Sequence, residues 1–174
     1  MLTFEKEVLG IYVSGHPLEE YEAIWKKHIT ATTADFLMDE ETGAVQIENG
    51  STATVGGIIA DKKIKYTKND KVMAFLQLED LAGSIEVIVF PRDYERYSSR
   101  LTVDNKVFIR GRVSVDEEKD GKLICEELTA FEDIPRMLWI KFPTLQEYEA
   151  GEAHMYDILR QSDGKDRVTI YIEQ

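Results

Sequence analysis

The sequence predicts a mainly β fold in which five strands close a small barrel and one helix lies between the third and fourth strands. Residues 71–91 alternate polar and apolar side chains on both sides of a Gly-Ser turn, the period of two that half-buried strands show. Residues 106–131 repeat this alternation around Asp120-Gly121, a strong hairpin signal. Between these hairpins, residues 91–101 carry apolar side chains at helical spacing.

The hairpin of residues 71–91 is expected to pack one face into the barrel and to expose the other face to solvent. The apolar phase expected inside the barrel is Val72, Ala74, Leu76, Leu78, Ile85, Val87 and Val89. The opposite phase carries Phe75, Ile88 and Phe90. Large apolar side chains on the solvent side of a sheet indicate a surface that meets something flat, such as a nucleic-acid base.

The remaining elements complete the barrel. The first strand is expected at residues 52–65, and the missing side chains of Gly56-Gly57 predict a bulge or bend that lets one strand serve two sheets. The helix places Tyr94, Tyr97 and Leu101 on one face and is expected to plug the open end of the barrel. Five strands in this order, with the helix after the third, predict an OB-fold barrel.

Three segments are expected: residues 1–50, 51–134 and 135–174. The first holds two short helices, at 2–13 and 17–28, followed by a connector. The last holds a strand, a helix after Pro143 and a second strand. An abrupt helical start and a β-α-β unit without a partner for its apolar faces predict a piece of a longer protein.

Composition limits the classes of function. The chain has 174 residues, 43% of them hydrophobic, and a formal net charge of -12, which opposes indiscriminate binding to phosphate backbones. No apolar run approaches the roughly 20 residues of a membrane span, and the first residues lack the charged-then-apolar layout of a secretory signal, so a cytoplasmic protein without a membrane partner is expected. Cys125 lies in an alternating apolar run and reads as a core residue.

The charge is unevenly distributed along the chain. Residues 51–134 hold 13 Lys and Arg against 16 Asp and Glu, whereas residues 1–50 hold 3 against 10. Around the first hairpin, Asp61 and Asp70 stand among five lysines at positions 62, 63, 65, 68 and 71, a local excess of three positive charges. A basic patch is therefore expected within an acidic protein.

These features predict a site for single-stranded nucleic acid. The expected contacts are Lys62, Lys63, Lys65, Tyr66, Lys68, Lys71, Phe75, Glu86, Ile88, Arg110 and Arg112, in which lysines meet phosphates and Phe75 stacks on a base. Three alternatives stay open. A neighbouring domain could cover Phe75, the arginines could pair with Glu126 or Glu127, and Glu86 could bind either a base or a lysine.

The sequence gives little support for catalysis, metal binding or cofactor binding. His16, His28 and His154 fall in three different segments, and no catalytic residues, metal site or cofactor are expected. One carboxylate of Glu79-Asp80, where a strand meets a turn, is expected to accept backbone N–H groups. The acidic loop at residues 116–120 opposes phosphate binding, so only one side of the site is basic.

Two stretches carry a family resemblance. EKEVLGIYVSGHPLEEY, from Glu5 to Tyr21, resembles the end of the finger region of bacterial C-family replicative DNA polymerases, the DNA polymerase III alpha subunits. MAFLQLEDLAGSIEVIVFP, from Met73 to Pro91, resembles the OB domain that follows it. The second stretch is also similar to anticodon-binding OB domains of aspartyl- and lysyl-type tRNA synthetases. In those domains an aromatic residue at the position of Phe75 stacks on a base, whereas Glu79-Asp80 stands where they often have Arg-Asp.

The resemblance implies a non-catalytic piece of a DNA-directed DNA polymerase whose OB domain holds the single-stranded template. The metal-binding aspartates of the polymerase would lie upstream. Residues 135–174 resemble the start of a terminal region that contacts the tau subunit of the clamp loader, and the sliding clamp is a further possible partner of the parent chain. A protein-docking OB module and an RNA-binding anticodon module are the alternatives.

Overall fold

A computed structural model describes residues 17–117, 119–134, 137–162, 164 and 166–173. The chain forms two compact units, one ending at Phe131 and the other beginning at Glu132. The helix expected at residues 2–13 lies outside the described residues. Among the described helices, none is long and apolar enough to cross a membrane.

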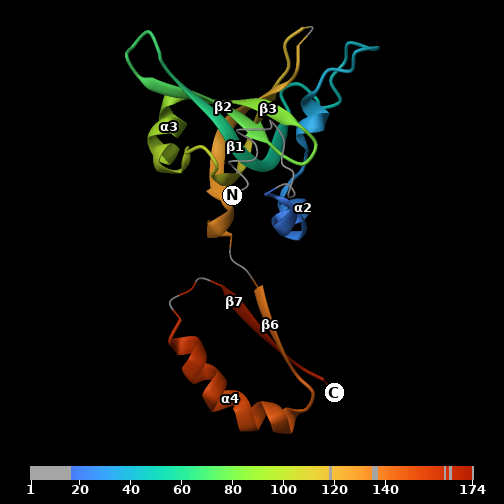
Figure 1. Ribbon diagram of the computed structural model, residues 1–174, viewed down its shortest axis with the longest axis vertical. Coiled ribbons are helices and arrows are strands. Elements are labelled where there is room, and N and C mark those ends of the chain that lie inside the picture. Colours follow the sequence, from blue (N-terminus) through green and yellow to red (C-terminus); the bar gives the residue numbers. More distant parts are fainter. Residues whose placement is uncertain (1–16, 118, 135–136, 163, 165, 174) are drawn as a thin grey trace. The chain divides into compact units, whose positions relative to one another are not determined.

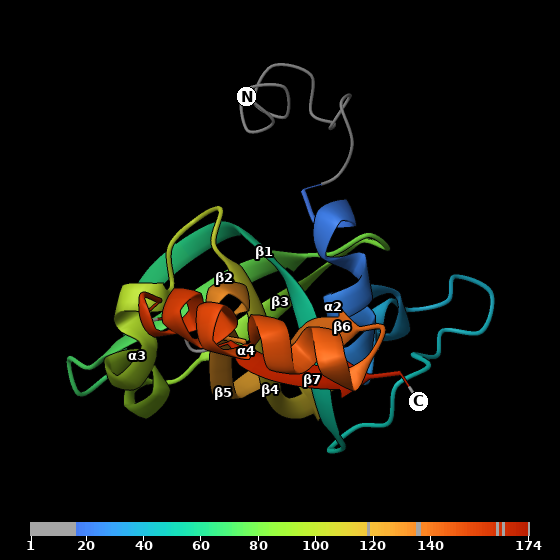
Figure 2. The same cartoon turned by 90° about the horizontal axis from the view of Figure 1, so that it is seen from below.

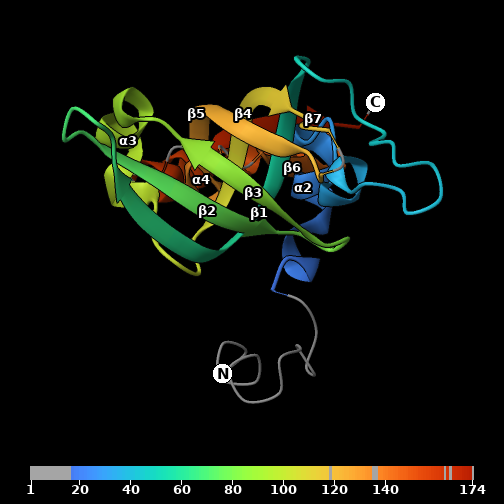
Figure 3. The same cartoon turned by 90° about the horizontal axis from the view of Figure 1, so that it is seen from above.

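The first unit is built around a closed five-stranded barrel (Figures 1 and 3). Its strands are β1 (Thr52–Tyr66), β2 (Val72–Glu79), β3 (Ser84–Val89), β4 (Lys106–Ser114) and β5 (Lys122–Ala130). They follow the order β1-β2-β3-β5-β4, and β4 pairs back to β1. β3 and β5 run parallel, while the other neighbours are antiparallel. The predicted mainly β barrel, with a helix between its third and fourth strands, is confirmed.

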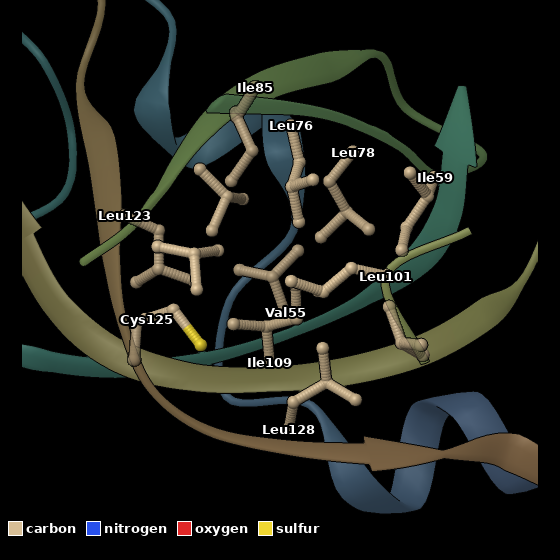
Figure 4. Close-up of a cluster of buried hydrophobic side chains, with 14 of the residues drawn as sticks. Val55, Ile59, Leu76, Leu78, Ile85, Leu101, Ile109, Leu123, Cys125 and Leu128 are labelled. Carbon is tan, nitrogen blue, oxygen red and sulfur yellow. The ribbon is translucent and has the colours of Figure 1, made fainter. Parts of the chain in front are cut away.

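The barrel interior is filled by apolar side chains of all five strands, including the predicted phase of β2 and β3 except Val72, which is only half-buried near the end of the hairpin. Side chains from all five strands converge there (Figure 4). Helix α3 (Pro91–Tyr97) continues into a 3-10 turn, η3 (Ser98–Arg100), and adds the buried Tyr97 and Leu101 to the same core. The helix thus contributes to closing the barrel because an end left open would expose apolar side chains to water.

β1 is long because it serves two neighbours. It pairs with β4 through Thr52–Ile58 and with β2 from Ile58 to Tyr66. The irregularity in register lies between Ile59 and Asp61, so the bend expected at Gly56-Gly57 was misplaced by a few residues. Glycine is required at position 56 because neighbouring side chains pack closely against the backbone there. A Cβ on Gly56 would stand 2.6 Å from the Phe108 ring and 2.7 Å from Trp25.

A second apolar cluster covers the outside of the barrel at β1 and β4. Phe108 points outward in the alternation of β4, yet it is buried because α2 (Glu22–His28) and η4 (Phe131–Asp133) lie over it. Its ring stacks on Phe131 at 4.1 Å between centroids. The Trp25 Nε1–H donates to the carbonyl oxygen of Gly56 at 2.6 Å. The 3-10 turn η1 (Glu19–Tyr21) supplies Tyr21, which meets Phe131 edge-on.

Asp80 attaches the connector to the barrel. Its buried carboxylate accepts the Thr33 N–H at 2.9 Å and the Thr33 hydroxyl at 2.5 Å, from the 3-10 turn η2 (Thr33–Phe36). The same carboxylate accepts the N–H groups of Ala82 and Gly83, which closes the turn between β2 and β3. The prediction that one carboxylate of Glu79-Asp80 binds backbone amides is confirmed for Asp80.

The second unit is a β-α-β motif, as predicted. β6 (Met137–Phe142) and β7 (Arg167–Ile172) pair in parallel, and α4 (Leu145–Arg160) connects them. Thr144 caps the helix by accepting the Glu147 N–H at 3.2 Å. Met155 is buried on α4, whereas the apolar side chains of Leu145 and Ile158 on the same helix are each 56% exposed.

Candidate nucleic-acid interface

One row of residues crosses the outer surface of the barrel. Lys63 on β1 is the register partner of Phe75 on β2, and Phe75 is the partner of Ile88 on β3. Ile88 is in turn the partner of Ile124 on β5, which pairs with Arg112 on β4. Register partners share a face of the sheet, and neighbouring strands lie about 4.8 Å apart. We call this surface the displayed face: an apolar centre with a cation at each end.

Phe75 is half-buried in the displayed face, and a lysine lies over its ring. The Nζ atom of Lys65 stands 4.6 Å from the ring centroid, within the range of a cation–π interaction. Lys65 reaches the ring because residues 63 and 65 share one side of β1, with Met73 as the register partner of Lys65. The site therefore brings together an aromatic ring and an ammonium group that can also contact a phosphate.

The next row along the displayed face is polar. Gln77 pairs with Glu86 in register, and Glu86 pairs with Lys122. The Lys122 Nζ lies 3.2 Å from a Glu86 carboxylate oxygen, so this carboxylate has a lysine partner. A hollow of about 460 Å³ opens beside this row, lined by Met38, Gln77, Ser84, Ile85, Glu86, Lys119, Asp120, Gly121 and Lys122.

The two arginines of β4 face carboxylates from β5. Arg110 lies 4.0 Å from Glu127, and Arg112 lies 4.0 Å from Glu126. All four side chains are at least 40% exposed, so these pairs are weak and screened by salt. Of the two arginines, Arg112 belongs to the row of Phe75, while Arg110 pairs in register with Thr54 and Glu127 farther along β4.

The lysine-rich hairpin between β1 and β2 divides its side chains between two faces. Lys63 and Lys65 share the displayed face with Phe75. Lys62 pairs with Leu76 and Tyr66 pairs with Val72, so both lie in the opposite phase, away from Phe75. Lys68 and Lys71 belong to the turn, which Asp70 closes with a φ of 55° and an N–H bond to the Thr67 carbonyl. The structure thus brings part of the predicted lysine cluster together with Phe75.

The acidic loop between β4 and β5 is attached at its base. Asp120 accepts the Met38 N–H at 2.9 Å, and the Gly121 N–H donates to the Phe36 carbonyl at 2.7 Å. Asp116, Glu117 and Asp120 are exposed, so this edge of the site carries negative charge.

Sequence reasoning missed Gln77, Ile124 and Lys122. Ile124 and Lys122 join the displayed face through the parallel pairing of β3 with β5. These strands are separated in the chain by a helix and a strand, and alternation within each strand does not reveal which strands are neighbours. Gln77 was visible in the displayed phase of β2, two residues from Phe75, and that position was the available signal.

The described residues hold no group of three or more His, Cys, Asp or Glu side chains placed to bind a metal ion. His28 lies 2.8 Å from the Ile24 carbonyl through Nδ1, His154 is exposed on α4, and His16 falls outside the described residues. Burial raises the pKa of the Cys125 thiol to about 12, with the Asp93 and Glu126 carboxylates adding to the rise. A neutral, enclosed thiol is a core side chain and a poor nucleophile.

Comparison with known proteins decides the family of the barrel. Residues 53–130 match the family model described as OB-fold nucleic acid binding domain. The barrel belongs to this OB-fold family. The matched range extends from β1 to the end of β5, so the OB domain and the closed barrel coincide.

The OB domain and its surroundings resemble part of DNA polymerase III subunit alpha. The chain is 35% identical over 136 residues to DNA polymerase III subunit alpha of Aquifex aeolicus, a match covering 78% of the chain and 11% of that protein. It is 36% identical over 156 residues to DNA polymerase III subunit alpha of Borreliella burgdorferi, covering 89% of the chain and 12% of that protein. The chain therefore spans only about a tenth of the length of these relatives.

Among solved structures, a domain of replication protein A from Methanococcus maripaludis is similar to the OB domain. The match has a TM-score of 0.42 and 11% identity, and it covers 49% of this chain and 89% of that one.

Proposed function

We propose that the OB domain binds single-stranded DNA and serves as the template-holding module of a replicative DNA polymerase. One observation carries the proposal: Phe75 and Ile88 lie side by side in register on the displayed face, with Lys63 and Lys65 on the same side. The resemblance to DNA polymerase III subunit alpha supports DNA as the ligand. Nucleotide addition would belong to other parts of the parent protein.

The arrangement suits a strand that crosses the sheet. A base stacks on Phe75 and its neighbour packs on Ile88, since every base offers a flat face whatever its sequence. Lys63, Lys65 and the turn lysines Lys68 and Lys71 contact phosphates at one end of the row. Arg112 supplies a cation at the other end of the row, on β4, three strands from Phe75 around the curved barrel wall.

The same charges predict weak binding. The net charge of -12 repels a polyanion, and Arg112 must leave Glu126 to reach a phosphate. When three or four of these five cations contact phosphates at one time, the logarithm of affinity falls against the logarithm of salt concentration with a slope of about -2 to -3, at roughly -0.7 per contact. Stacking on one ring contributes about 1–3 kcal/mol and does not discriminate strongly among bases.

Fluorescence anisotropy with labelled oligo-dT tests the proposal. Phe75→Ala is expected to weaken binding at least fivefold, corresponding to roughly 1 kcal/mol, while Phe75→Tyr keeps a ring and retains most of the affinity. Tyr171→Ala, which removes a 52% exposed ring from β7 in the other unit, is the matched control and is expected to have no effect. Binding that is insensitive both to Phe75→Ala and to salt would overturn the assigned face.

A protein-docking function is the second candidate, because one observation favours it. Glu86 pairs with Lys122, and Arg110 and Arg112 face Glu127 and Glu126, so much of the positive charge at this side of the barrel is already balanced. The apolar centre could then meet another polymerase domain, the tau subunit of the clamp loader or the sliding clamp. Capture of purified clamp-loader or clamp subunits without DNA, lost in Phe75→Ala, would favour docking. Preference for a tRNA loop over oligo-dT would instead favour an anticodon-type module.

A further inference from the structure

The β1–β2 hairpin presents ring and cationic side chains on both of its faces. On the displayed face lie Lys63, Lys65 and Phe75, the side assigned to the single strand. We call the other side the reverse face, which carries Lys62, Ile64 and Tyr66. Tyr66 is 71% exposed and Ile64 is 39% exposed. An aromatic ring left so open to water within a β-strand has no packing role in the barrel.

The reverse face is exposed because the hairpin extends past the barrel. Pairing of β1 with β4 ends at Ile58, whereas pairing with β2 continues to Tyr66. The register shift between Ile59 and Asp61 moves the inward side from odd to even positions, so the side that points into the barrel at Val55 and Ile59 continues as Ile64 and Tyr66, which emerge into solvent. Helix α3 lies beside the hairpin in all three views (Figures 1, 2 and 3).

The hairpin and the neighbouring helix α3 carry several cations near the reverse face, alongside the exposed carboxylates of Asp70 and Glu95. Lys62 lies on it, Lys68 and Lys71 are in the turn beside Tyr66, and α3 carries the exposed Arg92 and Arg96. The Arg92 side chain is 84% exposed and contacts Asp93 at 3.3 Å, while Arg96 lies over the Tyr97 ring at 5.0 Å. A flat, electron-rich ring among cations suits a polyanion with an exposed aromatic surface.

We propose that the hairpin binds a junction between single-stranded and double-stranded DNA. The single strand crosses Phe75 on the displayed face, and the last base pair of the duplex stacks on Tyr66 on the reverse face. The terminal base pair of a duplex is the one pair with an unstacked flat face. A junction also brings two phosphate backbones to one place, which matches cations on both faces of a two-stranded ribbon. The inference rests on the proposed single-strand binding and names the form of DNA that the hairpin recognises.

The test compares three DNA ligands at one salt concentration, using the whole 174-residue chain. The ligands are a single strand, a hairpin duplex carrying the same single strand as a tail, and a blunt hairpin duplex. Wild-type protein is expected to bind the tailed duplex about five- to tenfold more tightly than the single strand, as one added stacking contact predicts. The blunt duplex is expected to bind most weakly. A 2-aminopurine base in the terminal pair should change its fluorescence when Tyr66 stacks on it.

Tyr66→Ala is expected to abolish the preference for the tailed duplex and the 2-aminopurine response, and to leave single-strand affinity within twofold of wild type. Tyr66→Phe keeps the ring and is expected to keep the preference for the tailed duplex and the 2-aminopurine response. Tyr171→Ala removes an exposed tyrosine from the other unit and is the matched control, expected to behave as wild type. Equal binding of tailed duplex and single strand by wild type would overturn the inference while leaving the proposed function intact. An equal loss for both ligands in Tyr66→Ala would also overturn it, because the single strand would then itself wrap onto the reverse face. Absence of single-strand binding by wild type would overturn the proposed function as well.

Discussion

The Nζ atom of Lys65 lies 4.6 Å from the centroid of the Phe75 ring, so the predicted stacking residue is partly covered by the lysine predicted to meet phosphate. An exposed cation–π contact contributes about 0.5–1 kcal/mol, less than the 1–3 kcal/mol of base stacking. A base can therefore displace the ammonium from the ring. The displaced lysine stays within reach of the phosphate attached to that base, so one rearrangement makes both contacts.

Lys65→Gln is expected to reduce the salt dependence of oligo-dT binding. Removing one phosphate contact makes the log-log salt slope shallower by about 0.7 and weakens binding most at low salt. Anisotropy titrations at four or more salt concentrations measure the slope. Lys65→Arg keeps the charge and should keep the slope. Lys141→Gln, a lysine paired with Glu173 at 2.7 Å in the other unit, is the matched control. An unchanged slope in Lys65→Gln would remove Lys65 from the set of phosphate contacts.

Asp80 is expected to stabilise the barrel more than any exposed carboxylate. Asp80→Ala leaves the buried Thr33 hydroxyl and N–H without their acceptor, at a cost on the order of 3 kcal/mol in the free energy of unfolding. Thr33→Val removes only the hydroxyl bond and should cost about 1 kcal/mol. Urea unfolding followed by circular dichroism measures both. Asp61→Ala, at an exposed carboxylate, should stay within about 0.5 kcal/mol of wild type.

A double-mutant cycle separates the bond from general damage at Asp80. If the two residues interact as the geometry indicates, Asp80→Ala should cost clearly less in the Thr33→Val background than in wild type. Strict additivity of the two substitutions would show that the contact contributes little to stability.

The sequence determined the barrel well because its signals are local. Alternation placed Leu76, Val87 and Cys125 in the core, and the Pro91 signal placed the helix after the third strand. Phe108 shows where such reasoning fails. Because it alternates with the buried Val107 and Ile109, it points to the outside of the barrel, but its burial depends on ring contacts with His28 and Phe131, which are distant in the chain. No periodicity within β4 contains that information.

The candidate site likewise contains residues that the sequence could predict and residues that it could not. Phe75 and Ile88 were predictable because they lie on neighbouring strands of one hairpin, whose register follows from a short turn. Ile124 and Lys122 reach the displayed face only through the pairing of β3 with β5. The separation of Lys62 and Tyr66 from Lys63 and Lys65 follows from strand phase, which a count of charges along the chain does not resolve.

Trp25 is expected to secure the N-terminal helix to the barrel. Trp25→Phe leaves the Gly56 carbonyl without the 2.6 Å indole bond and should lower the free energy of unfolding by about 1–3 kcal/mol. Trp139→Phe is the matched control, since Trp139 is 63% exposed on β6 and should change stability by less than about 0.5 kcal/mol. Equal effects of the two substitutions, measured by urea unfolding, would contradict a specific role of the indole bond.

Cys125 is expected to make barrel stability fall at high pH. Burial raises the pKa of its thiol from an ordinary value of 9.0 to about 12. Between these values the unfolded chain loses the thiol proton while the folded chain keeps it, so unfolding releases a proton and becomes easier as pH rises. The stabilising contribution of the neutral thiol is fully present below pH 9 and is lost progressively toward pH 12.

The comparison of wild type with Cys125→Ala isolates this effect, because the other titrating groups are common to both proteins. The difference in unfolding free energy between the two should be constant from pH 7 to 8.5 and then narrow by at most about 1.4 kcal/mol per pH unit. Alkylation with iodoacetamide at pH 8 supplies an independent measurement: the folded protein should resist it and the urea-unfolded protein should react. Rapid alkylation of the folded chain, or a difference in stability that does not change up to pH 10.5, would contradict the enclosed, neutral thiol.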